Sequence, residues 1–283
     1  MMETVIGRPR PRSQSRLGSA LTGTFWSAVA TLRLGLRTVP AAPALMAIAI
    51  LPEFAQHAAE VHLGMYDSRA AFRAAGDDPL RWAFAYPKIA GFVLAILLVA
   101  RFQALGSVRE ALLIGGGNLL RLGFAIGLTL VAELPFDRLK SMIEPPEIDI
   151  ALALVSGLIQ AGLLVYIVGA LLDDRTNSLR GAFTVRWPTA LLMTFLAALV
   201  FVPAQALHTG NHVAAFGQPA PIVWGLMLFD SLWVGIMAAC LGTALAVGYA
   251  AGPRWRGWTE RPGRAFTAGR PRPAASSAPA TFP

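Results

Sequence analysis

The sequence predicts an all-α, polytopic membrane protein with six transmembrane helices, built as three sequential helical hairpins with interfacial lead-in helices. Its composition is the first observation: 55% of the residues are hydrophobic, 14% are charged, and the mean hydropathy is +0.55. Soluble domains usually carry about 25% charged residues, so they match this chain poorly. The second observation is a series of long apolar stretches, and the third is an uneven distribution of arginine between the loops that join them. Together these features indicate a chain that crosses a membrane several times.

Six stretches approach the roughly 20 mostly apolar residues that a helix needs to span a bilayer. The fourth and the sixth contain no Lys or Arg at all. The predicted spans cover residues 41–64, 83–105, 118–136, 150–172, 188–208 and 223–250.

A loose internal repeat accompanies the first, third and fifth spans. Each of these spans follows a short arginine-containing segment and a helix breaker, and each has a proline towards its far end, namely Pro52, Pro135 or Pro203. In the first unit, Leu21, Phe25 and Leu32 share one helical face, which favours a helix lying in the membrane interface. The alternative is a helix packed on the bundle.

Charge divides the chain into a basic N-terminal tail (1–18), a six-span membrane domain (19–251) and an Arg- and Pro-rich tail (252–283) that is predicted to be disordered. Most of the 24 Lys and Arg residues fall on the side of the two tails. Because cytoplasmic loops are enriched in Lys and Arg, we expect both termini in the cytoplasm and the protein in the bacterial inner (plasma) membrane.

The net charge of +8 is explained by this topology, so no nucleic-acid partner is needed. The expected partners are the lipid bilayer and its anionic lipid headgroups, contacted by Arg254, Arg256 and Arg261 of the C-terminal tail. Alternatively, these arginines only fix the topology.

The first span ends in a stripe of polar side chains. Gln56 and His57 each lie three or four residues from both Glu53 and Glu60, so the four side chains share one face of a helix. Ionisable groups at membrane depth face a bundle interior or a wet cavity, and this face is therefore expected to point away from lipid.

The prolines of the repeat relate this stripe to the fifth span. His57 follows Pro52 by five residues, Lys140 follows Pro135 by five, and His208 follows Pro203 by five. These positions, with Asp230 at a similar depth in the sixth span, predict a polar cluster near the outer membrane face. Its members are Glu53, His57, Glu60, His208, His212 and Asp230.

Imidazole and carboxylate groups bind zinc or another divalent metal, and they also form proton relays. The candidate metal ligands are His57, Glu60, His208 and His212. No HExxH, CxxC pair or glycine-rich phosphate loop is present, and no catalytic residue is assigned. The side chains could equally satisfy one another at the helix ends without a cofactor.

The layout of lead-in helix, span, outer proline and returning span resembles the uncharacterised six-span inner-membrane proteins of bacteria, including YciC-like families. The resemblance covers residues 20–251 in plan, with no motif matched residue by residue, and it implies an envelope protein without an assigned reaction. Three functions are compatible with the sequence. They are a non-enzymatic structural or regulatory role, a small transporter or channel for protons, metal ions or a polar solute through the polar cluster, and a membrane-embedded metalloenzyme.

Overall fold

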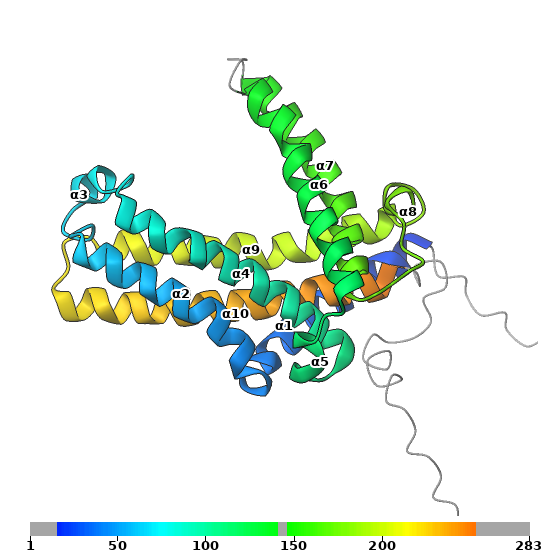
Figure 1. The fold of residues 1–283 in the computed structure, drawn as a ribbon, viewed down its shortest axis with the longest axis horizontal. Coiled ribbons are helices and arrows are strands. Elements are labelled where there is room, and N and C mark those ends of the chain that lie inside the picture. Colours follow the sequence, from blue (N-terminus) through cyan, green and yellow to red (C-terminus); the bar gives the residue numbers. More distant parts are fainter. Residues whose placement is uncertain (1–15, 141–145, 253–283) are drawn as a thin grey trace, which may run out of the picture.

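The computed structural model describes residues 16–140 and 146–252, and every regular element in those two ranges is a helix. Figure 1 shows long helices lying side by side, with one hairpin leaving them at a steep angle. The helices are α1 (Arg16–Ala41), α2 (Pro43–His62), α3 (Arg69–Ala74), α4 (Pro79–Leu105), α5 (Val108–Leu112), α6 (Gly116–Lys140), α7 (Pro146–Leu171), α8 (Leu179–Phe183), α9 (Trp187–Ala215) and α10 (Ala220–Ala251). The predicted all-α membrane fold is confirmed.

Three sequential hairpins make up this fold, as the sequence predicts. They are α2 with α4, α6 with α7, and α9 with α10. Helix α10 lies at the centre, because α1, α2, α4 and α9 all pack against it and its most apolar stretch is almost entirely buried. The core is therefore organised around the last helix of the two described ranges.

Glycines allow the other helices to approach α10 closely. A Cβ atom added at Gly242 would lie 2.5 Å from the carbonyl oxygen of Ile96 on α4, and one added at Gly248 would lie 2.7 Å from Met193 on α9. Small residues at such positions let membrane helices pack backbone to backbone.

Helices α1 and α2 meet at a bend of 88°. Five helices are long and apolar enough to cross a membrane, namely α4, α6, α7, α9 and α10, and the number reaches six only if α1 and α2 together form one broken span. Helix α1 packs along α10 through a face of small residues that includes Gly35, while Leu21 and Phe25 of its predicted apolar face point outward.

The hairpin of α6 and α7 diverges from the other helices (Figure 1). Its two helices are joined within the apolar region by Gln160, which donates from Nε2 to Glu133 Oε2 at 2.9 Å. The segment 65–82 contains the six-residue helix α3, which begins at the capping residue Ser68. Short helices α5 and α8 precede α6 and α9, and the internal repeat itself stays a prediction.

Candidate functional site

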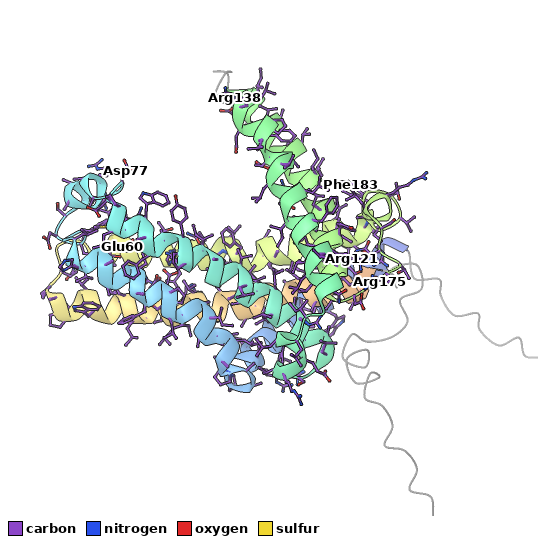
Figure 2. All side chains as sticks on the ribbon, in the orientation of Figure 1. Glu60, Asp77, Arg121, Arg138, Arg175 and Phe183 are labelled. Carbon is purple, nitrogen blue, oxygen red and sulfur yellow. The ribbon has the colours of Figure 1, made fainter. Side chains whose placement is uncertain are left out.

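The predicted polar side chains lie where α2 and α9 end and where α4 and α10 begin, which we call the α3 end of the bundle (Figures 1 and 2). Both α2 and α9 continue through their prolines, so α2 extends ten residues beyond Pro52 and α9 extends twelve beyond Pro203. Membrane helices tolerate such prolines because neighbouring groups satisfy the freed carbonyl. The continuing helical turns carry His57 and His208 into the bundle instead of leaving them at a loop.

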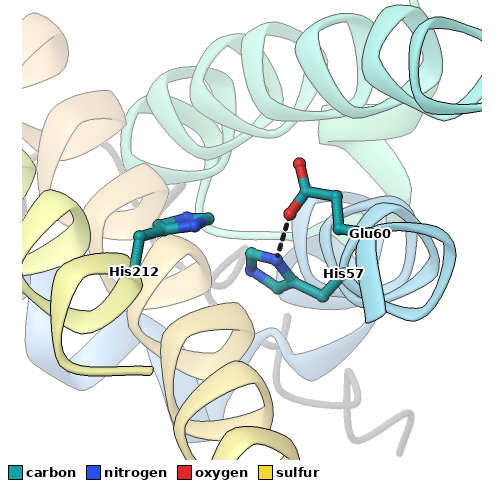
Figure 3. A group of neighbouring side chains, drawn as sticks. All are labelled: His57, Glu60 and His212. Carbon is teal, nitrogen blue, oxygen red and sulfur yellow. Dashed lines mark hydrogen bonds and ion pairs between the residues drawn. The ribbon is translucent and has the colours of Figure 1, made fainter. Parts of the chain in front are cut away.

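His57 is fully buried and is surrounded by carboxylates. Its Nε2 lies 3.1 Å from Asp230 Oδ2 and 3.2 Å from Glu53 Oε1, and its Nδ1 lies 3.2 Å from Glu60 Oε2. Figure 3 shows the contact with Glu60 and places His212 opposite, on α9. An ionised carboxylate only accepts hydrogen bonds, so the ring satisfies both sides when both of its nitrogens carry a proton.

Asp230 joins α10 to α2 and α9. Its Oδ2 lies 2.6 Å from His208 Nδ1 and 3.8 Å from His212 Nε2, in addition to the contact with His57. Its Oδ1 accepts a hydrogen bond of 2.8 Å from Asn211 Nδ2. One fully buried carboxylate therefore bonds to two imidazole rings and an amide, and a third ring lies beside it.

Tyr66, in the loop after α2, fixes the orientation of His212. Its hydroxyl donates to Glu60 Oε2 at 2.7 Å and lies 3.0 Å from His212 Nδ1. Burial and the Glu60 carboxylate raise the pKa of Tyr66 far above its usual value, so the hydroxyl keeps its proton. A hydroxyl donates only one hydrogen bond, so His212 Nδ1 must donate to it. A neutral His212 then presents its Nε2 lone pair towards Asp230.

Two cations on α4 balance the carboxylates of α2. Lys88 Nζ lies 2.7 Å from Glu53 Oε1, and Arg81 Nε lies 3.3 Å from Glu60 Oε1. With a protonated His57, the three carboxylates of the cluster face three positive groups. The network is therefore close to neutral although most of it is buried.

Three overlapping groups of side chains have ligand atoms within 4.8 Å of one another. Two of them involve His57, either with Glu60 and His212 or with Glu53 and Asp230. The third group consists of His208, His212 and Asp230. Around a tetrahedral zinc ion with bonds of about 2.0–2.1 Å, ligand atoms are about 3.3 Å apart, so small adjustments would bring any of these groups to coordination distance.

A cavity of about 550 Å³ opens on one side of the cluster. Its wall includes His208 and His212 of α9, Gln56 and Glu60 of α2, and basic residues of α3 and α4. Because Asp230 and His57 are fully buried beneath it, the cluster has one dry side and one side open to a ligand.

All six residues of the predicted polar cluster lie at the α3 end, and the hydrogen bonds and ion pairs above connect them in one network. His62, the remaining histidine, is exposed on the last turn of α2. Arg254, Arg256 and Arg261, predicted to contact lipid headgroups, lie outside the described residues, as does the Lys140 side chain.

Sequence reasoning did not assign Tyr66, Arg81, Lys88 or Asn211 to the cluster. The sequence does indicate a role for Lys88, because a lysine within a predicted span requires a buried partner of opposite charge. Tyr66 lies in a loop without periodicity, so no pattern indicated it.

Comparison of the chain with models of protein families, with curated proteins and with solved structures finds no match. The resemblance to six-span bacterial inner-membrane proteins therefore stays an expectation from the layout of the spans.

Proposed function

We propose that this membrane protein binds a divalent transition-metal ion, zinc in the first instance, through His208, His212 and Asp230. The observation that carries the proposal is the convergence of these three side chains beside a cavity, with ligand atoms within 4.8 Å of one another. His208 and His212 are four residues apart on α9, so both rings project from one helical face. Two imidazoles and one carboxylate, with further positions open, form a common ligand set for zinc and for ferrous iron.

The hydrogen bonds of His212 favour a cation at this position. Its Nε2 lone pair and the Asp230 carboxylate oxygen are 3.8 Å apart, and both are acceptors. A metal ion between them would replace this repulsion with two coordinate bonds. His208 would bind through Nδ1 once its proton is carried on Nε2 instead.

Residues around the three ligands supply the supporting hydrogen bonds that metal sites require. Asn211 and His57 both donate hydrogen bonds to Asp230, and the Tyr66 hydroxyl oxygen accepts one from His212 Nδ1. Such partners orient ligands and raise their affinity for the metal. The arrangement supports a site formed before the ion arrives.

A non-enzymatic structural role is the second candidate, and the near neutrality of the network favours it. Lys88, Arg81 and a protonated His57 balance the three carboxylates without an ion. In that case the cluster only joins α2, α4, α9 and α10.

A transporter is less well supported. Below Asp230, α10 is lined by buried apolar residues that include Val234, Met237 and Leu241, and these pack against α2, α4 and α9. Within the described residues, this core separates Asp230 from the charged groups at the other end of the bundle. We accordingly propose that the protein binds the metal ion and does not conduct it. We also propose that it lies in a bacterial inner membrane with both termini in the cytoplasm.

The test is metal analysis of the full-length protein purified in detergent. We expect about one equivalent of zinc after loading and removal of excess ion, and cobalt substitution should give the visible absorption bands of a site with nitrogen and oxygen ligands. Affinity should fall in acid, because the histidines must release protons to bind the ion. The double variant H208A/H212A should lose the metal.

His62→Ala is the matched control, because this exposed histidine lies outside the cluster. It should keep the zinc content of the natural chain. If the natural chain itself binds no zinc, iron or cobalt, the proposal is contradicted. The structural role would then be the better supported function. Retention of the metal by a folded H208A/H212A protein would exclude these ligands.

A further inference from the structure

The cavity above the cluster has a strongly basic wall. Arg69 and Arg73 of α3 and Arg81 and Lys88 of α4 line it, whereas Glu60 is the one carboxylate that does so among the described residues. Glu60 is already engaged by Arg81, Tyr66 and His57. The cavity is thus positive, although a carboxylate-rich network lies directly beneath it.

Arg69 and Arg73 are the unbalanced pair. They stand one turn apart on α3, and within the described ranges neither forms an ion pair, whereas Arg81 and Lys88 both do. Like charges at this spacing repel each other weakly, so an anion between the two side chains would stabilise α3. Phe72 packs its ring against His212, at 6.3 Å between centroids, and holds α3 over the cavity.

Gln56 gives an independent indication of a ligand. It is 3% exposed and lines the cavity. Its Nε2 donates to Glu60 Oε1 at 2.8 Å, which fixes the orientation of the amide, and its Oε1 has no hydrogen-bond partner within the described residues. A buried acceptor without a donor is unfavourable, so a ligand that brings a hydroxyl group would satisfy it.

We infer that the cavity binds a phosphate group, held by Arg69 and Arg73, with a hydroxyl of the ligand donating to Gln56. Arginine pairs bind phosphate through several parallel charge-assisted hydrogen bonds. The inference deepens the proposed function, because a divalent ion on His208, His212 and Asp230 would add positive charge at the floor of the cavity and offer an open position to a phosphate oxygen. The arginines and Gln56 do not depend on the ion.

The size and the position of the cavity indicate more than a free ion. A volume of about 550 Å³ lies within the range of sites for small organic ligands. The wall is formed by α4 on one side and α9 on the other, and these helices pack on α10 without extensive contact with each other. Two sources of the phosphate fit this position, a phospholipid headgroup entering from the side and a water-soluble phosphomonoester entering from the α3 end.

The experiment measures binding to the zinc-loaded, full-length protein in nanodiscs of neutral phosphatidylcholine. Inorganic phosphate and glycerol phosphate are titrated calorimetrically, with sulfate as the anion that lacks a hydroxyl near neutral pH. In parallel, retention of phosphatidic acid and phosphatidylglycerol from mixed nanodiscs is measured by native mass spectrometry. Binding of the soluble phosphates would identify a phosphomonoester as the source of the phosphate group. Selective retention of the anionic lipids would identify a phospholipid headgroup.

The variant R69Q/R73Q should weaken binding at least about tenfold, since each guanidinium contributes charged hydrogen bonds. The matched control is R33Q/R37Q, because this exposed arginine pair has the same spacing on α1. It should bind like the natural chain. Gln56→Met should reduce the preference for phosphate over sulfate.

Equal affinity of R69Q/R73Q and R33Q/R37Q, or absence of binding from both sources, would overturn the inference. Zinc content is measured in each sample. A zinc-loaded protein that binds no phosphate contradicts this inference alone, whereas a protein that binds phosphate through Arg69 and Arg73 but holds no metal contradicts the proposed metal site alone.

Discussion

The two ends of the bundle carry similar side chains in different surroundings. At the α3 end, Asp230 is fully buried and bonds to groups from two other helices, α2 and α9. At the opposite end, Asp174 bonds to Arg186 at 2.8 Å and to the Tyr249 hydroxyl at 2.6 Å, yet its side chain is 23% exposed. Figure 2 shows Glu60 at the first end and Arg121 and Arg175 at the second.

Burial determines how much these contacts contribute to the free energy of unfolding. Exposed ion pairs such as Asp173 with Arg175, whose side chains are 51% and 66% exposed, are screened by water and contribute little. A buried carboxylate that loses its partners has no water to replace them. Contacts at the α3 end therefore matter both for stability and for ligand binding, whereas contacts at the opposite end mainly tie the ends of helices together.

The largest expected difference is between Asp230→Ala and Asp174→Ala. The first change removes the acceptor of His57, His208 and Asn211 within the bundle, and it should lower the free energy of unfolding by about 3–5 kcal/mol. The second should lower it by no more than about 1 kcal/mol. Unfolding of both variants in the same detergent measures the difference, and equal losses would show that burial does not distinguish the two ends.

The two tyrosines provide a finer comparison. Tyr66→Phe removes the acceptor of His212 Nδ1, and we expect zinc affinity to fall about tenfold, as when an outer hydrogen-bond partner of a metal ligand is lost. Tyr249→Phe removes the bond to Asp174 and should leave zinc affinity unchanged. Competition with a chromogenic chelator measures both, and a similar fall in the two variants would indicate a general loosening of the fold.

The smallest expected effect is the pH dependence of the opposite end. Burial of Asp174 opposes ionisation, but hydrogen bonds from Thr176 and Tyr249 outweigh it and lower the pKa of Asp174 to about 2. A lowered pKa stabilises the folded state above the unfolded value near 3.8, and this contribution disappears as the pH falls towards 2. Asp174→Asn should therefore lower the melting temperature slightly at pH 6, and the difference from the natural chain should narrow between pH 4 and pH 2. A constant difference across this range would exclude Asp174 as the titrating group.

The sequence predicts the helices well because their physical basis is local. Apolar length identifies the spans, and the spacing of Glu53, His57 and Glu60 predicts a buried face on α2. The common offset from Pro52 and Pro203 relates His57 to His208 because α2 and α9 continue through their prolines in the same way.

What the sequence does not predict depends on packing between distant segments. Pro40 and Pro43 mark the position of the bend after α1 but not its angle of 88°, and both α1 and α2 pack on α10 on either side of it. The pairing of Lys88 with Glu53 likewise requires α4 to lie beside α2. Tyr66 reaches the cluster because the loop after α2 folds back, and periodicity carries no information about such a loop.

The central position of α10 has a consequence for biosynthesis. The helices that surround α10 emerge from the ribosome before it, and their inward faces have no core to cover until Ala220–Ala251 is translated. Assembly of the bundle must therefore await insertion of α10. A stop codon between α9 and α10 would leave α1, α2, α4 and α9 in the bilayer without the helix on which they pack, exposed to quality-control proteolysis.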